Sequence, residues 1–315
     1  MTSAPIFIDQ AAIAAALPPL RLAQALEAMF AVGAEVPSRL HYAVPTPGGG
    51  ANDLLLMPAW RVGGKIGVKL VTVRGEAGPG PTVQAIYVVA DAITGAFEAV
   101  LDGRELTNRR TAATSALAAR RLARPDARRL LVVGAGALAP YLAEAHTVCR
   151  GLRSVAVWAR RPRQAHALAA ALAPRLRAEV TVVEDLEQAV GEADIITCAT
   201  TTLAPIILGA WLREGQHLDL VGGYTPAMRE VDDAAIQRAR VFVDDRVAAL
   251  SEAGDLIQPL RAGAIGENHI LGDLAGLVRG ECPGRTDARD ITLFKSVGLG
   301  SEDLAAAMLL LEGRG

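Results

Sequence analysis

A short glycine-rich segment near the middle of the chain has the pattern of a phosphate-binding turn. The apolar run Leu130–Val133 leads into Gly134-Ala135-Gly136-Ala137-Leu138-Ala139, and helical spacing follows. In such a unit the first glycine permits a tight turn, and the second lets the backbone approach a pyrophosphate. The helix N-terminus then offers unpaired N–H groups to the anion. We therefore expect residues 134–138 to bind a dinucleotide, with a ligand-free turn as the alternative.

The next strand-like run indicates which dinucleotide. The run Ser154–Trp158 is followed by Ala159, Arg160, Arg161 and, after a proline, Arg163. Sites that prefer NAD carry an acidic residue about 20 residues past the glycines, where it accepts from the ribose hydroxyl. Guanidinium groups at this place suit a 2′-phosphate instead. We expect NADPH, with NADH possible; a solvated basic loop is the alternative.

Lysine is rare, which makes each one a candidate for chemistry. The 32 basic residues include only Lys65, Lys69 and Lys295, so 29 are arginines. A guanidinium cannot transfer a proton at ordinary pH, whereas an ammonium can. Lys65 and Lys69 project from the same face of an expected strand. The apolar neighbours of Lys69 favour a buried catalytic role for it, whereas Lys65 is expected to face solvent.

Composition excludes several classes of protein. The formal net charge of -2 provides no basic field for nucleic acid, and no apolar run is long enough to span a bilayer. The first ten residues lack the features of a signal peptide. The three cysteines and five histidines have no metal-ligand spacing. We expect a cytoplasmic protein with no metal site and no nucleic-acid or membrane partner.

The patterns predict an α/β protein of two domains. The first comprises residues 1–112 with 300–315, and the second residues 113–299. Short strands between Gly- and Pro-rich loops predict an antiparallel or mixed sheet in the first domain. Its expected strands are Ile6–Ile8, Asp53–Pro58, Lys65–Val73 and Thr82–Asp91, and its helices are Gln10–Ala16 and Pro19–Val32. A helix is expected over Leu106–Arg124, capped by Thr107 or Asn108. A last helix over Ser301–Leu311 is expected to pack back on this domain.

Alternating strands and helices predict a Rossmann-type, doubly wound parallel sheet in the second domain. Its expected strands are Leu130–Val133, Ser154–Trp158, Val180–Val183, Ile195–Cys198, His217–Val221 and Arg240–Val243. Ligands bind at the carboxyl ends of such strands. The residues that follow two of these ends are therefore expected to touch the cofactor: Ala199, Thr200, Thr201, Val221 and Gly222.

Several segments together resemble the ornithine cyclodeaminase/mu-crystallin family. They are the glycine turn, Gly67-Val-Lys69, the run from Arg110 to Ala118, Pro226-Ala-Met-Arg-Glu230 and Ile291–Gly298. The resemblance implies a homodimer whose N-terminal sheet mediates pairing and holds the substrate, while the Rossmann domain holds the nicotinamide cofactor. It implies carboxylate binding by Lys69, Arg110 and Arg39. It also implies cofactor contacts from Thr111, Val297 and Gly298.

The chemistry of Arg110 supports its assignment independently. A small carboxylate substrate calls for a bidentate arginine, and Arg110 is expected to open an Ala/Thr-rich helix. The family resemblance also has one departure. Cyclodeaminases carry an acid two residues before the proline of the Gly-Gly-x-x-Pro segment, where this chain has Tyr224. This form resembles the branch of the family that reduces cyclic ketimines.

We therefore expect NADPH-dependent reduction of Δ1-pyrroline-2-carboxylate and Δ1-piperideine-2-carboxylate to L-proline and L-pipecolate. Lys69 would hold the carboxylate or the nitrogen and deliver a proton. Three alternatives remain. They are an alanine dehydrogenase or another imine-forming dehydrogenase, a mu-crystallin-like protein that binds NADPH and a small ligand, and an ornithine cyclodeaminase.

Overall fold

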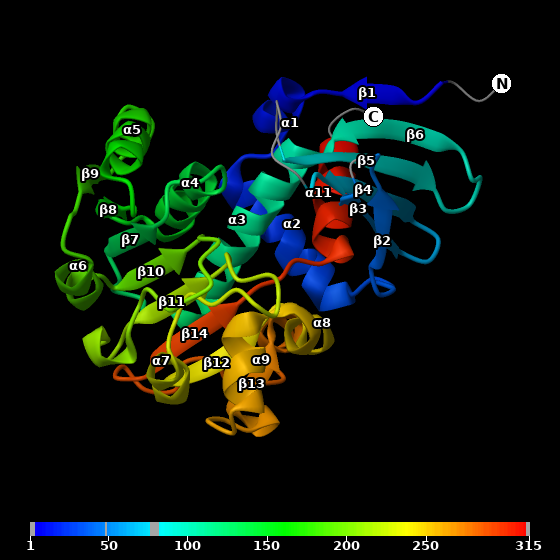
Figure 1. Cartoon of the computed structure of the whole chain (residues 1–315). Helices are drawn as coiled ribbons and strands as arrows, with labels where there is room; N and C mark the ends of the chain where they lie inside the picture. Colours follow the sequence, from blue (N-terminus) through cyan, green and yellow to red (C-terminus); the bar gives the residue numbers. More distant parts are fainter. Residues whose placement is uncertain (1–3, 48, 76–81, 313–315) are drawn as a thin grey trace. The chain divides into compact units, whose positions relative to one another are not determined.

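The computed structural model describes residues 4–47, 49–75 and 82–312. The chain forms two compact units, Met1–Thr111 with Leu299–Gly315, and Ala112–Gly298. Helix α3 (Gly103–Leu122) runs from the first unit into the second (Figure 1). The chain therefore passes from the first unit to the second and returns near its end.

A six-stranded sheet forms the framework of the first unit, in the order β1-β6-β5-β4-β3-β2. Strand β1 is parallel to β6, and the other neighbours are antiparallel. The strands are β1 (Ile6–Ile8), β2 (Leu40–Pro45), β3 (Ala51–Trp60), β4 (Lys65–Val73), β5 (Val83–Asp91) and β6 (Phe97–Asp102). Strand β2 was not predicted from the sequence, because this edge strand is exposed along its length and has no alternation of buried and exposed residues.

Three helices belong to the first unit: α1 (Gln10–Ala16), α2 (Pro19–Val32) and α11 (Gly300–Glu312). Helix α11 packs against α2 and against β3 and β4, which covers one face of the sheet. Register places Met57, Lys69, Tyr87 and Leu101 in one row on the covered face, and all four are buried. An added Cβ on Gly67 would lie 1.9 Å from the Tyr87 hydroxyl, so the missing side chain makes room for that ring.

Helix α3 begins earlier than the sequence analysis predicts. Its first residue is Gly103 rather than Leu106, and the expected cap by Thr107 or Asn108 is wrong. Asp102 ends β6, and its Oδ1 accepts from the backbone N–H groups of Arg104 and Glu105 at 3.0 and 2.9 Å. An aspartate at this place satisfies the first N–H groups of the helix, so the helix starts directly after the strand.

The second unit contains the predicted doubly wound sheet. Its eight strands are all parallel, in the order β13-β12-β14-β11-β10-β7-β8-β9. They are β7 (Arg129–Val133), β8 (Ser154–Trp158), β9 (Glu179–Val182), β10 (Ile195–Cys198), β11 (His217–Leu220), β12 (Ala239–Val243), β13 (Ile270–Asp273) and β14 (Ile291–Lys295). Strands β13 and β14 were not predicted from the sequence. Strand β14 lies between β11 and β12, so the last strand in sequence is internal to the sheet.

Helices cover both faces of this sheet (Figure 1). The helices α4 (Ala139–Arg150) and α5 (Pro162–Leu172) bury alanine and leucine against one face. The helices α6 (Leu186–Glu192) and α7 (Asp233–Arg238) bury alanine, valine and isoleucine against the other face. The remaining helices are α8 (Arg246–Glu252), α9 (Gly254–Arg261), α10 (Leu274–Arg279), η1 (Gly209–Trp211) and η2 (Glu267–His269). None of the helices in the described ranges combines the length and apolar character needed to cross a bilayer.

Candidate active site

Two buried cations and two buried carboxylates form a cluster in the first unit. Lys69 Nζ lies 2.7 Å from Asp303 Oδ2. Arg110 donates through Nε to Asp303 Oδ1 at 3.0 Å and through Nη1 to Glu302 Oε2 at 2.5 Å. Asp303 therefore bridges the lysine of β4 and the arginine of α3. Helix α11 supplies both carboxylates, because it packs on the sheet face from which Lys69 projects.

Burial and the neighbouring charges set the protonation of this cluster. Burial lowers the pKa of Lys69 to about 8, although the Asp303 carboxylate acts in the opposite direction. Burial also opposes the charge on Arg110, but Asp303 and Glu302 more than offset it and raise the arginine pKa. Burial raises the pKa of Tyr87 well above its usual value. Arg110 and Tyr87 therefore keep their protons near neutral pH, whereas Lys69 can exchange its proton.

Two of the three predicted substrate-binding residues, Lys69 and Arg110, lie close together in the structure. The predicted position of Arg110 at the start of its helix is not observed. Lys69 and Arg110 share Asp303, and the charge on Arg39 also lowers the pKa of Lys69. Arg39 is partly exposed and lies just before β2. The expectation that Arg110 opens its helix is wrong, because α3 begins at Gly103. Any binding of an anion by Arg110 therefore rests on its charge and N–H groups, without help from a helix end.

The glycine turn of the second unit is tightly folded at Gly134 and open to solvent at Gly136. Gly134 has a φ of +111°, and an added Cβ would lie 2.8 Å from the Ala199 carbonyl oxygen. Glycine therefore permits both the turn after β7 and the close approach of the loop after β10. An added Cβ on Gly136 would project into open space, as expected where a ligand approaches the backbone. Helix α4 begins at Ala139, three residues further on, so its N-terminus can face the anion.

The three predicted arginines follow β8 beside this turn. The Gly134 N–H donates to the Trp158 carbonyl at 2.9 Å, which joins the turn to the end of β8. Ala159 is buried, whereas Arg160, Arg161 and Arg163 are exposed. Arg161 is the N-cap residue of α5, but its side chain makes no capping hydrogen bond. The side chains of this loop are thus available to a ligand at the carboxyl end of the sheet.

Buried carboxylates organise the other predicted cofactor loops. Glu230 accepts from Thr200 after β10 and from Gly222 after β11. Asp244 Oδ2 accepts from the backbone N–H groups of Val297 and Gly298, at 2.7 and 2.6 Å. These contacts bring together loops that are distant in sequence at one edge of the sheet. The neighbouring predicted residues are Ala199, which is partly buried, Thr201, which is exposed, and Val221, which is buried. Thr111 is buried on α3 beside Arg110.

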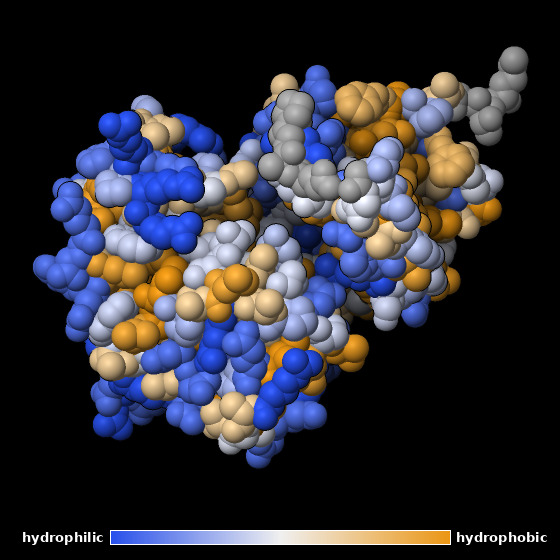
Figure 2. Space-filling view, viewed as in Figure 1, coloured by the Kyte–Doolittle hydropathy of each residue, from blue (hydrophilic) through white to orange (hydrophobic). Residues whose placement is uncertain are grey.

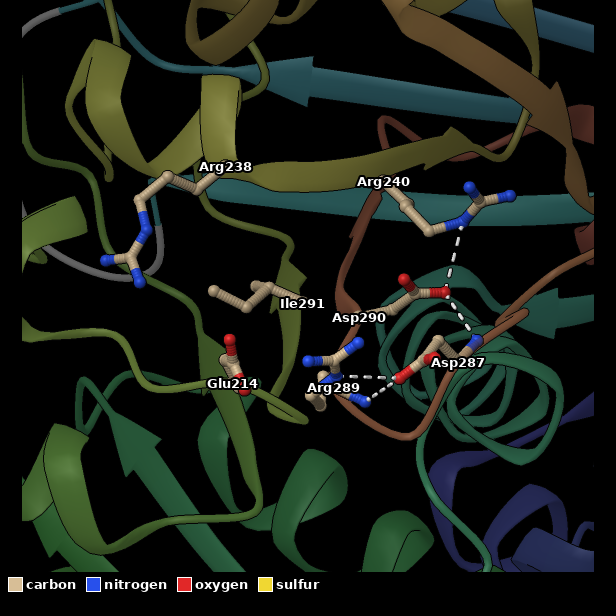
Figure 3. A pocket seen from close by; sticks show the side chains of 7 residues that line it. All are labelled: Glu214, Arg238, Arg240, Asp287, Arg289, Asp290 and Ile291. Atoms are coloured by element: carbon tan, nitrogen blue, oxygen red, sulfur yellow. Dashed lines mark hydrogen bonds and ion pairs between the residues drawn. The ribbon is translucent and has the colours of Figure 1, made fainter.

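A different pocket lies at the opposite, amino edge of the same sheet (Figure 3). Its volume is about 520 Å³, and its walls come from residues at or before the starts of β11, β12 and β14. The lining residues are Glu214, Arg238, Arg240, Asp287, Arg289, Asp290 and Ile291. Arginines and carboxylates are equal in number there, and Arg289 and Arg240 pair with Asp287 and Asp290. The arrangement therefore has no excess charge that would select an ionic ligand.

In the described part of the chain, no group of three or more His, Cys, Asp or Glu residues could hold a metal ion.

Comparison with known proteins agrees with the resemblance. A sequence profile of the ornithine cyclodeaminase/mu-crystallin family matches residues 7–313. The chain belongs to this family. Among curated members, it is 44% identical over 259 residues to the Δ1-pyrroline-2-carboxylate reductase of Paracoccus denitrificans, covering 81% of this chain and 82% of the relative.

Two solved structures are similar to this protein over almost the whole chain. One is the Δ1-pyrroline-2-carboxylate reductase of Thermococcus litoralis in complex with NADH and L-proline. Its TM-score is 0.90 at 31% identity, with 98% of this chain and 96% of that chain covered. The other is an archaeal alanine dehydrogenase dimer with bound NAD. Its TM-score is 0.89 at 25% identity, with 98% and 95% covered. The predicted family and α/β fold are confirmed.

The acidic partners of the site, and one buried lysine, were not predicted from the sequence. Glu302 and Asp303 lie in the last helix, for which only a packing role was expected. Glu230 lies in the segment Pro226–Glu230, which carries the family resemblance but had no predicted role. No role was predicted for Lys295. Its side chain is fully buried, with Nζ 3.3 Å from Asp255 Oδ2. Two signals in the sequence pointed to Lys295: the rarity of lysine and its place in the segment Ile291–Gly298.

Proposed function

We propose that this protein reduces Δ1-pyrroline-2-carboxylate and Δ1-piperideine-2-carboxylate to L-proline and L-pipecolate, with NADPH as the preferred reductant. The curated relative and the Thermococcus structure support a nicotinamide-dependent reductase that acts on a cyclic imine. The observation that carries the proposal is the buried Lys69–Asp303–Arg110 arrangement, which combines an arginine with a lysine whose pKa lies near the working pH. Such a pair can both bind a carboxylate and move a proton.

Arg110 is proposed to bind the substrate carboxylate together with Arg39. A guanidinium has five N–H donors, and Glu302 and Asp303 occupy only the Nε and Nη1 sides of Arg110. The remaining donors can take a further carboxylate. The two acids hold the guanidinium plane in place before the substrate arrives, which reduces the entropy that binding must overcome.

Lys69 is proposed to give a proton to the ring nitrogen. The nicotinamide cofactor, when bound, supplies a hydride to the carbon of the C=N bond. The nitrogen gains an electron pair as the double bond is reduced, and the Lys69 ammonium can protonate it, so that the product is a secondary amine. Asp303 lies 2.7 Å away and stabilises the ammonium form between turnovers. If the substrate enters as the iminium, Lys69 instead holds the carboxylate.

The function is tested by following NADPH oxidation with Δ1-pyrroline-2-carboxylate beside pyruvate plus ammonia. We expect turnover with the imine to exceed that with pyruvate and ammonia. The similarity to an alanine dehydrogenase makes the reverse outcome informative, because preferential use of pyruvate and ammonia would assign that activity instead. Binding of NADPH without oxidation in either assay would contradict both and indicate a ligand-binding protein.

Replacing Lys69 tests its role as proton donor. Lys69→Met should lower kcat about 100-fold or more, since general acid catalysis contributes at least this much. In the unmodified enzyme, kcat/KM should fall as the pH rises through about 8, because the neutral amine has no proton to give. Lys65→Met is the matched control, since Lys65 lies on the same strand but pairs with Asp91 and Glu98. Equal activity of the two variants would refute the role of Lys69.

The cofactor preference is tested at the loop after β8. Replacing Arg160 and Arg161 together with alanine should lower the ratio of kcat/KM for NADPH over NADH by about 10-fold or more, because hydrogen bonds to a charged group contribute about 1.5–3 kcal/mol. Activity with NADH should change little. Arg153→Ala, just before the amino end of the same strand, is the control. An unchanged ratio in the double variant would mean that the arginines do not bind a 2′-phosphate.

We also infer a homodimer that pairs through the sheet face opposite α11. Register places Leu40, Leu56, Leu70 and Ile86 in one row on that face, and Leu40 and Ile86 are 48% and 42% exposed. Apolar exposure continues over β1 and β6, where Figure 2 shows apolar surface at the upper right. Exposed apolar residues that gather on one surface are typical of an interface. The relative solved as a dimer supports a second copy as the occupant.

The oligomeric state can be measured by light scattering. We expect a dimer for the unmodified chain and a shift to monomer for Leu56→Glu, because a carboxylate in the apolar row would lose its hydration without gaining a partner. Val62→Glu is the control, since Val62 is 91% exposed in a turn outside this face. A monomeric unmodified chain, or equal behaviour of the two variants, would contradict the inferred interface.

A further inference from the structure

The carboxylate of Glu230 joins two loops at the carboxyl edge of the second unit. Its Oε1 accepts from the backbone N–H and the hydroxyl of Thr200, both at 2.8 Å. Its Oε2 accepts from the backbone N–H of Gly222, also at 2.8 Å. Thr200 follows β10, and Gly222 follows β11. One fully buried side chain therefore fixes the ends of two adjacent strands relative to each other.

The backbone at Gly222 lies very close to Thr200 and to the Glu230 carboxylate. An added Cβ on Gly222 would lie 2.0 Å from the Thr200 carbonyl oxygen and 2.4 Å from Glu230 Oε1. The loop can therefore reach the carboxylate only because residue 222 has no side chain. Gly223, the next residue, is equally constrained, since an added Cβ would lie 2.5 Å from Asp255 Oδ2.

A second layer of buried charge supports Glu230. Asp255 Oδ1 accepts from the backbone N–H of Glu230 at 2.7 Å and from that of Val231 at 3.2 Å. Lys295 Nζ lies 3.3 Å from Asp255 Oδ2, too poorly aligned for a hydrogen bond but close enough for an ion pair. Burial raises the pKa of Glu230, and the Lys295 charge opposes that rise. Lys295 thus helps the carboxylate to stay ionised.

The order of the strands indicates which part of a dinucleotide meets these loops. The sequence β8-β7-β10-β11 places the arginines after β8 on one side of the glycine turn and the Glu230 loops on the other. A dinucleotide lies across such a switch point, with its pyrophosphate on the first turn. Its adenosine half then faces β8, and its nicotinamide half faces β10 and β11.

We propose that Glu230 is a positioning residue for the nicotinamide half of the cofactor. It acts by holding the backbone of Thr200 and Gly222, with Asp255 and Lys295 as its support. This inference rests on the proposed use of a nicotinamide cofactor but not on which imine is reduced. It also gives a task to a segment, Pro226–Glu230, that the family resemblance marked without a role.

Glu230→Gln is the informative change, because it keeps the size of the side chain. A glutamine has one acceptor oxygen and one NH2 group, whereas both oxygens of Glu230 accept hydrogen bonds. The NH2 group must then face an N–H group of Thr200 or Gly222, so that one of the two loops is released. The glycine turn and the arginine loop are not touched by this change.

The test compares the affinity for NADPH with that for 2′-phospho-ADP-ribose, which is the same cofactor without its nicotinamide. Calorimetric titration of Glu230→Gln should give an NADPH Kd raised about 10-fold, with the Kd of the fragment changed less than about 2-fold. Asp194→Asn is the matched control. Asp194 is a buried carboxylate that accepts from the N–H groups of Arg128 and Arg129, at the amino edge of the sheet. It should lower the melting temperature and leave both affinities unchanged.

Equal weakening of NADPH and the fragment in Glu230→Gln, or no change in either, would overturn the proposal. If this variant does not fold, Gly222→Ala gives the same comparison, because its added methyl group displaces the same loop. If the unmodified chain binds the cofactor but reduces no imine, and Glu230→Gln weakens NADPH binding alone, this inference stands and the proposed substrate is wrong. If the unmodified chain binds neither NADPH nor NADH, both the proposed function and the role of Glu230 are wrong.

Discussion

The energetic cost of burying charge governs the design of both units. A buried ion is tolerated only when other groups compensate it, and this chain does so with carboxylates. In the first unit, Asp303 compensates Lys69 and Arg110 at once. In the second, Glu230 and Asp244 compensate backbone N–H groups that the ends of parallel strands leave without partners. The same chemical group thus fixes side chains in one unit and loops in the other.

The two uses differ in what they leave for a ligand. The ion pairs of the first unit hold the guanidinium of Arg110 while leaving several of its N–H groups for another anion. The carboxylates of the second unit are occupied by the protein itself, so a ligand would meet the loops and not the acids. A group that binds substrate and a group that shapes a binding surface can therefore be distinguished by whether their hydrogen-bonding capacity is already used.

Local sequence patterns predicted much of this structure. The glycine turn, the strand Lys65–Val73 and the burial of Lys69 could be read because each depends on residues close together in the chain. The start of α3 could not be predicted in this way. Asp102 caps the helix, although Thr107 and Asn108 were equally plausible caps from the sequence. Both are ordinary capping residues, and the end of the preceding strand decided between them.

The acidic residues of the site, Glu302 and Asp303, could not be predicted from local sequence patterns for a different reason. Arg110 and Asp303 are 193 positions apart, and neither carries a local mark of the other. Strand β14 was also not predicted. It is buried on both faces, so its sequence shows no alternation of polar and apolar residues. Only the arrangement of the whole chain identifies the partners of these residues.

The return of the chain to the first unit at Leu299 has a consequence for biosynthesis. A ribosome delivers Lys69 and Arg110 long before it delivers Glu302 and Asp303, and the whole second unit is translated in between. During that interval the nascent first unit carries two cations whose buried counterions do not yet exist, so its core cannot close around them. Completion of the first unit must therefore wait until α11 has been synthesised, and premature termination within this helix would leave a protein whose second unit is whole and whose first is not.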